Sequence, residues 1–137
     1  NVDTFKSDLQ NIGNVILTPH IGGSTGEAQE SIGREVATSL LRFAVTGATT
    51  GAVNFPQIEM PRDKDTVRIL NVHRNVPGVL RDVNRIVSEH QANIHSQMLS
   101  TDAEIGYLIM DLDHDVTSDV YEGIGNLATS IRTRTVY

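Results

Sequence analysis

Residues 71–80 decide the fold, and they read NVHRNVPGVL. This order predicts a strand end, a tight polar loop and a helix start. Pro77 suits a first helical turn, where its missing N–H would have no partner anyway, and Gly78 lets a backbone or a small ligand approach closely. The next amides can point at an anion, as helix N-termini do. The stretch therefore predicts either a site for a small carboxylate, with His73 and Asn75 beside it, or an ordinary strand–loop–helix corner.

The residues on both sides of this loop predict an α+β domain. Apolar runs and alternations mark four strands, and apolar spacings of three and four residues mark two helices. In chain order these elements are 67–72, 79 to about 91, 92–101, 105–112, 116–127 and 130–137. The order β-α-β-β-α-β is the ferredoxin-like split unit, whose two helices cover one face of the sheet. We expect the other face, and any uncovered edge strand, to meet solvent or a partner.

The residues before this domain predict a strand and a helix that belong to a different fold. Residues 15–18 form a short apolar run, which is typical of a strand covered on both faces. Ser24 and Glu27 make a capping-box pattern that starts a helix, and Gly47 ends it. Residues 49–55 look extended. One strand and one helix cannot bury both of their faces, so this segment needs partners that the chain lacks.

A charged stretch bracketed by prolines, residues 56–65, predicts the domain boundary. We place a first segment at residues 1–64 and the β-α-β-β-α-β domain at residues 65–137. The chain begins with Asn1 rather than Met and soon enters a buried-looking strand, so we expect a fragment of a longer protein.

The composition of the 137 residues narrows the class of protein. The absence of cysteine excludes a disulfide framework and thiolate chemistry. A net charge of −6, without a basic stripe, argues against a nucleic-acid partner. No apolar run is long enough to cross a membrane, and no signal-peptide pattern opens the chain. We therefore expect a cytoplasmic protein with no membrane partner.

His20 is the first candidate for catalysis. It follows the predicted strand at residues 15–18, at the end where open α/β sheets place catalytic groups. Gly22 and Gly23 lead into the predicted helix, so a phosphate or nucleotide could approach their backbone. A histidine there could exchange a proton with a hydroxyl or carbonyl group near neutral pH. The alternative is a loop histidine that is satisfied by backbone carbonyls.

The remaining histidines and aspartates do not predict a metal site. His90, His95 and His114 have no ligand-like spacing to one another or to a carboxylate pair. The aspartates at 111, 113 and 115 alternate at a strand end, which is more typical of a solvated edge than of a cation site.

Two motifs together resemble a known family. Residues 17–25, LTPHIGGST, with EAQE at 27–30, are similar to the catalytic-histidine segment of the D-2-hydroxyacid dehydrogenases. The further motifs AVNFP at 52–56, HRNVPG at 73–78 and RTRTVY at 132–137 narrow the resemblance. Together they resemble the C-terminal third of the bacterial D-3-phosphoglycerate dehydrogenase family whose members carry a C-terminal ACT domain.

The resemblance implies roles for the first segment. Members of this family oxidise 3-phosphoglycerate to 3-phosphohydroxypyruvate with NAD, the first step of L-serine synthesis. His20 would donate or accept the proton, and residues His20, Ile21, Gly22 and Gly23 would lie against the cofactor. Residues 1–64 would end the nucleotide-binding domain and return to the substrate-binding domain. The dinucleotide motif, the catalytic arginine and the orienting glutamate lie upstream in this family, so we expect the chain alone to be inactive.

The resemblance also implies a regulatory role for residues 65–137, as an ACT domain that pairs with another subunit. L-Serine, the feedback inhibitor, would bind at that interface, held by His73 and Asn75 of one subunit and by Asn93 of the other. The parent would assemble dimers into a tetramer. The alternative is an ACT-like dimerisation module that binds no ligand.

Overall fold

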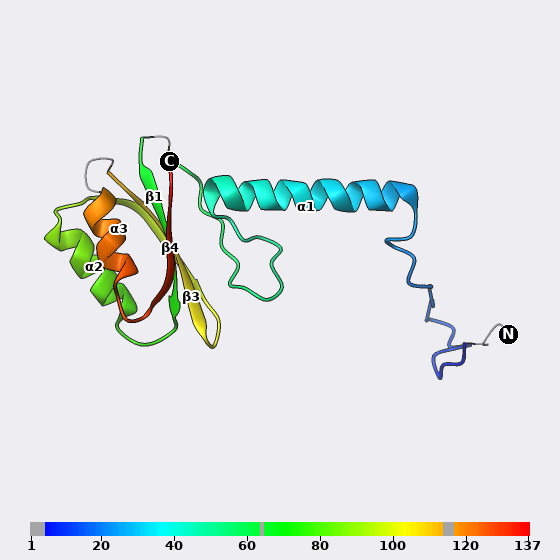
Figure 1. The fold of residues 1–137 in the computed structure, drawn as a ribbon. Coiled ribbons are helices and arrows are strands. Elements are labelled where there is room, and N and C mark those ends of the chain that lie inside the picture. The colour runs from blue at the N-terminus through cyan, green and yellow to red at the C-terminus, as the bar shows by residue number, and fades with distance from the viewer. Residues whose placement is uncertain (1–4, 64, 114–116) are drawn as a thin grey trace. The chain divides into compact units, whose positions relative to one another are not determined.

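A computed structural model describes residues 5–63, 65–113 and 117–137 (Figure 1). The chain divides into two compact units, Asn1–Val36 and Ala37–Tyr137. The elements are α1 (Gly26–Thr46), β1 (Val67–Arg74), α2 (Val79–Glu89), β2 (Ile94–Thr101), β3 (Ile105–Leu112), α3 (Thr117–Gly125) and β4 (Ser130–Val136). No helix among the described residues is long and apolar enough to cross a membrane.

The second unit contains the predicted split β-α-β-β-α-β fold. Its four strands form one sheet in the order β2-β3-β1-β4, and each neighbouring pair is antiparallel. Helices α2 and α3 lie together on one face of this sheet (Figure 1). The core between them consists of buried aliphatic side chains, among them Ile69, Val83, Leu108, Met110 and Ile124. The predicted α+β class and element order are therefore confirmed.

The opposite face of the sheet is partly covered by the chain itself. Ile58 and Met60 are buried against Leu70 and Ile109 on this face. The Tyr107 hydroxyl donates a hydrogen bond of 2.7 Å to the carbonyl of Gly47, just after α1 ends. The expectation that this face meets only solvent or a partner is therefore wrong in part, because a linker rich in apolar residues can fold back onto it.

The predicted domain boundary between residues 64 and 65 stays a prediction.

The predicted strand at residues 15–18 is absent, and this prediction was wrong. A strand needs a neighbour for its backbone hydrogen bonds, and the described part of the chain supplies none there. The side chain of Ile16 is accordingly 90% exposed. Residues 49–55 also form a turn rather than an extended segment, with the amide of Ala52 bonded to the carbonyl of Thr49.

Helix α1 begins one residue later than its capping box predicted. The hydroxyl of Thr25, not Ser24, accepts a hydrogen bond of 3.1 Å from the amide of Ala28. The helix ends at Thr46, and Gly47 follows with a φ of 78°, the left-handed conformation that ends many helices. The predicted stop is thus confirmed. No residue of α1 is buried, and its apolar residues Ile32, Val36 and Leu40 are 47%, 51% and 63% exposed.

Candidate functional site

The loop after β1 is held by backbone groups of the β2–β3 turn. The amide of Asn75 donates to the carbonyl of Glu104 at 2.8 Å. The side-chain Nδ2 of Asn75 donates to the carbonyl of Asp102 at 2.6 Å. Asp102 in turn accepts two hydrogen bonds of 2.8 Å from the amides of Ile105 and Glu104, which lower its pKa. These contacts fix the position of Asn75 and leave its Oδ1 as the atom that can accept from a ligand.

Helix α2 begins at this loop without a side-chain cap. Gly78 is its N-cap residue, with a φ of 96°, and a glycine has no side chain that could cap the helix. A residue with a Cβ would be strained in that conformation, so the glycine is required for the tight entry. The first amides of the helix are therefore available to an anion, and the helix dipole favours negative charge there.

His73 lies near the end of β1, five residues before the N-cap residue Gly78. It is only 2% exposed, and its Nδ1 lies 3.0 Å from the side-chain Oδ1 of Asn71. Burial lowers the pKa of His73 and outweighs a hydrogen bond with the Asn71 backbone, which raises it. The ring is packed over Gly106 of β3, because any Cβ at that position would overlap His73 Nε2. His73 is therefore a neutral, buried base near pH 7 rather than a surface cation.

Asn71 was not singled out in the sequence, although it joins His73 to a polar network. Its Nδ2 lies 2.8 Å from Ser130 Oγ and 2.9 Å from Thr133 Oγ1. The sequence does contain a sign of this role. Residues 67, 69, 71 and 73 share one face of the strand, and Asn71 is a polar residue on that otherwise largely apolar face. An amide at such a position needs partners, and the β4 hydroxyls supply them.

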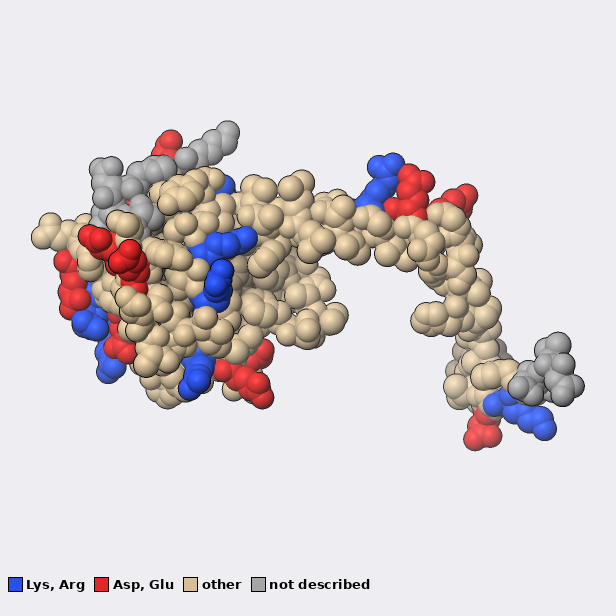
Figure 2. Space-filling view, in the orientation of Figure 1, with Lys and Arg blue, Asp and Glu red and all other residues tan. Residues whose placement is uncertain are grey.

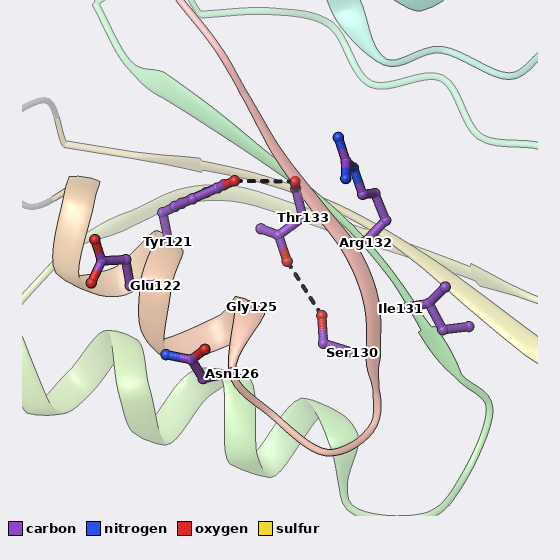
Figure 3. Close-up of a pocket in the computed structure, with 8 residues that line it drawn as sticks. All are labelled: Tyr121, Glu122, Gly125, Asn126, Ser130, Ile131, Arg132 and Thr133. Carbon is purple, nitrogen blue, oxygen red and sulfur yellow. Dashed lines mark hydrogen bonds between the residues drawn. The ribbon is translucent and has the colours of Figure 1, made fainter.

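The outer side of this network is a shallow pocket of about 400 Å³ between α3 and β4. Figure 3 shows Ser130 and Thr133 facing each other there, with oxygens 3.3 Å apart. Tyr121 of α3 points across to the backbone of β4, and its hydroxyl lies 3.4 Å from the Thr133 carbonyl. The network thus lies between His73 and the surface of the domain. Figure 2 shows acidic and basic side chains interspersed on the visible face of this unit.

Asn93, the third residue predicted to bind the effector, lies at the other end of the sheet. It directly precedes β2, whose Ile94 pairs with Leu112, whereas His73 pairs with Gly106. Leu112 and Gly106 are six residues apart along β3, which corresponds to about 20 Å. Asn93 is exposed. Within one chain the fold therefore brings His73 and Asn75 together and keeps Asn93 apart from them.

The candidate catalytic residue His20 lies in an exposed turn of the first unit. The amide of Ile21 donates to the Pro19 carbonyl at 2.9 Å, and Gln29 Nε2 is bonded to the Gly23 carbonyl. A Cβ placed on Gly22 would have nothing within 4 Å. These residues expose backbone but do not enclose a dinucleotide by themselves.

The described residues hold no group of three or more histidine or carboxylate side chains that could bind a metal ion. The assignment of Asp111 to a solvated edge was wrong, because its side chain is buried and ion-paired with Arg68. A carboxylate buried on a covered face of a sheet needs a charged partner, and Arg68 of β1 is the partner of Asp111. His114 and Asp115, which were considered with it, lie outside the described residues.

Comparisons with known proteins match the β-α-β-β-α-β domain by itself and also the chain as a whole. Residues 69–131 match the family model of the AHAS small subunit-like ACT domain. The chain is 49% identical over its full length to D-3-phosphoglycerate dehydrogenase of Dictyostelium discoideum, of which it covers 33%. It is 43% identical to D-3-phosphoglycerate dehydrogenase of Escherichia coli, with 100% of this chain and 34% of that protein covered. The chain therefore spans about a third of the length of these relatives.

A solved structure of an ACT domain was also found. The ACT domain from GTP pyrophosphokinase of Chlorobium tepidum superposes with a TM-score of 0.47 and 12% identity, over 52% of this chain and 96% of that chain.

Proposed function

Since this chain is a relative of the D-3-phosphoglycerate dehydrogenases, as its motifs predicted, and carries an ACT domain, we propose that it is the regulatory part of such an enzyme. The parent would oxidise 3-phosphoglycerate with NAD in the first step of L-serine synthesis. The chain would bind L-serine as a feedback inhibitor at an interface between two ACT domains. The observation that carries this proposal is the convergence of an uncapped helix start, Asn75 and neutral His73 at one end of the sheet.

The chemistry of these groups is complementary to a small amino acid. The first amides of α2 suit the α-carboxylate of the ligand, because they are donors at the positive end of a helix dipole. Asn75 Oδ1 and His73 offer acceptors for the ammonium or hydroxyl group. Each of these contacts would be worth about 1–3 kcal/mol if its loss left a partner unpaired inside a closed site.

The edge strand β2 supports the proposal that a second subunit completes the site. Among the residues that the structure describes, β2 pairs only with β3, so its other edge has unpaired backbone groups. Met98 and Leu99 on this strand are 40% and 36% exposed. Antiparallel pairing of two β2 strands across a two-fold axis would set the start of one beside the end of the other. β2 ends at Thr101, next to the Asp102 carbonyl that holds Asn75. Asn93 of the partner subunit would then approach the effector site.

Calorimetric titration of the 137-residue chain with L-serine tests the proposal. We expect saturable binding, and we expect Asn75→Ala and Asn93→Ala to weaken it about tenfold each. Asn14→Ala is the matched control, because Asn14 is an exposed asparagine in a turn of the first unit. A folded dimer that shows neither heat nor a thermal shift at millimolar L-serine would refute the proposal.

For the first segment, we propose that residues His20, Ile21, Gly22 and Gly23 contribute to the catalytic and NAD site of the parent enzyme. The support is the similarity of the chain to these dehydrogenases over its full length. Because His20 is exposed in a turn, we expect no NADH production from 3-phosphoglycerate by the chain alone. A steady rate of NADH formation by the purified chain, absent from His20→Ala, would contradict this.

A second candidate function is a dimerisation module that binds no ligand, which the unpaired edge of β2 favours. Sedimentation of the chain with and without L-serine separates the two functions. The module predicts an unchanged dimer in the Asn75→Ala and Asn93→Ala variants and no binding of L-serine. The regulatory function predicts that L-serine tightens the dimer and that either variant abolishes this effect.

A further inference from the structure

We propose that Asn71 is a positioning residue that holds the His73 imidazole with its proton on Nδ1, so that Nε2 meets the effector as a hydrogen-bond acceptor. The inference rests on the proposed amino-acid site and deepens it. His73 would then accept a hydrogen bond from the ammonium or hydroxyl group of the effector and would not bind its carboxylate.

The orientation of the Asn71 amide follows from its partners on β4. Its Nδ2 lies 3.4 Å from the backbone carbonyl of Arg132, which can only accept a hydrogen bond. The same nitrogen lies within hydrogen-bond distance of the hydroxyls of Ser130 and Thr133, shown facing each other in Figure 3. The nitrogen of the amide must therefore face β4, and its oxygen must face His73.

The tautomer of His73 follows from that orientation. Asn71 Oδ1 is an acceptor without a proton, so the His73 Nδ1 that lies 3.0 Å from it must be the donor. A neutral imidazole carries one proton, which leaves Nε2 with a lone pair. Burial keeps the ring neutral near pH 7, because it lowers the pKa of His73.

The direction of Nε2 gives this tautomer a role in the site. Nε2 lies over Gly106 of β3, and Gly106 pairs with Thr101, the last residue of β2. This is the end of the sheet where Asn75 is tied to Asp102 and where α2 begins. A carboxylate at Nε2 would set lone pair against lone pair, whereas an ammonium or hydroxyl group would donate to it. The effector carboxylate is left for the amides of α2.

Nitrogen NMR of the ¹⁵N-labelled 137-residue chain at about pH 8, well above the ordinary histidine pKa of about 6.5, reads the tautomer directly. A protonated ring nitrogen and an unprotonated one resonate far apart, and a His73→Gln variant assigns the signals. We expect a protonated Nδ1 and an unprotonated Nε2 in the free protein. We also expect the Nε2 signal to move on addition of L-serine, as it gains a hydrogen-bond donor.

Asn71→Ala should let the proton redistribute to Nε2 and weaken L-serine binding about three- to tenfold. Asn71→Asp keeps an acceptor oxygen beside Nδ1, although it loses the donor that faces the Arg132 carbonyl, and it should keep the proton on Nδ1. Asn14→Ala is the control and should change neither the His73 signals nor the affinity for L-serine. If the alanine variant fails to fold, the tautomer of His73 in the wild-type chain still tests the inference.

Each outcome decides between the inference and its alternatives. A proton on Nε2 in the wild-type chain overturns the inference, as does a folded Asn71→Ala chain with unchanged tautomer and affinity. Loss of the Nδ1 proton in Asn71→Asp overturns it as well. A chain with the expected tautomer that binds no L-serine refutes the proposed effector and the ligand half of the inference, while Asn71 stands as the residue that sets the tautomer.

Discussion

Arg68 and Asp111 form a buried ion pair on the sheet face opposite α2 and α3. The Arg68 Nε and Nη2 atoms lie 2.7 and 2.8 Å from the two carboxylate oxygens, and the side chains are 0% and 1% exposed. The guanidinium also donates to three backbone carbonyls, those of Thr46, Met60 and Pro61, at 2.8–3.0 Å. All five donors of the arginine are thereby used. The pair ties the end of α1 and the linker to the sheet.

Replacement of Arg68 by methionine should lower the free energy of unfolding by about 3–5 kcal/mol, because it leaves a buried carboxylate without a partner. Arg85→Met is the control. It removes an exposed pair with Glu89 of the same 2.8 Å length and should cost about 0.5 kcal/mol or less. Urea unfolding followed by circular dichroism measures both. An Arg68→Met chain as stable as the control would show that the linker contacts do not depend on the pair.

Gly47→Ala should destabilise the domain by about 2–5 kcal/mol, which combines left-handed strain with overpacking. The residue has a φ of 78°, and a Cβ there would lie 2.5 Å from Leu70 Cδ2 and 2.9 Å from the Tyr107 hydroxyl. Gly51→Ala separates the two causes, because Gly51 has a φ of 87° with nothing within 4 Å of a Cβ. We expect a loss of only about 1–2 kcal/mol there. Equal losses in thermal unfolding would argue that packing against Tyr107 is loose.

Gly106→Ala should displace the His73 ring, since a Cβ at residue 106 would overlap Nε2. We expect a loss of stability of about 1–3 kcal/mol and L-serine binding too weak to measure by calorimetry. The matched control is Gly125→Ala, where a Cβ would meet Thr133 Oγ1 at an ordinary 3.7 Å. Full L-serine affinity in a folded Gly106→Ala chain would remove His73 from the site.

The stability of the domain should depend on pH through His73. Burial lowers the folded pKa of His73 below its ordinary value of 6.5, so the unfolded chain binds the proton more readily. Its contribution is complete above about pH 6.5 and declines as the pH falls toward the folded pKa. His95 acts in the opposite sense, because its hydrogen bond with Asp113 raises its pKa.

The His73 contribution is isolated by comparison with His73→Gln, which cannot titrate. We expect the difference in unfolding free energy between the wild-type chain and this variant to shrink as the pH falls from about 7.5 to about 5. Urea titrations at several pH values measure this difference. A constant difference over that range would mean that His73 is protonated as readily in the folded chain as in the unfolded one.

The local parts of the proposed effector site were predictable from the sequence. Gly78 and the helix start, with His73 and Asn75 just before them, are set by short-range backbone preferences, and the structure places them together. Asn93 was assigned from family resemblance, and only the register of the sheet places it at the opposite end. The strand predicted at residues 15–18 failed for a related reason, because an apolar run becomes a strand only where a neighbouring strand accepts its hydrogen bonds.

By itself, the sequence determined the β-α-β-β-α-β order, the α2 start at Gly78 and the α1 stop at Gly47. Apolar periodicity and left-handed glycines act over a few residues, so they can be read directly from the chain. Only the tertiary structure decided that Arg68 pairs with Asp111 and that Asn71 lies between His73 and the β4 hydroxyls. These partners are 43 and 59 residues apart in the chain. Which buried polar groups meet depends on strand order and register, and no local pattern encodes that.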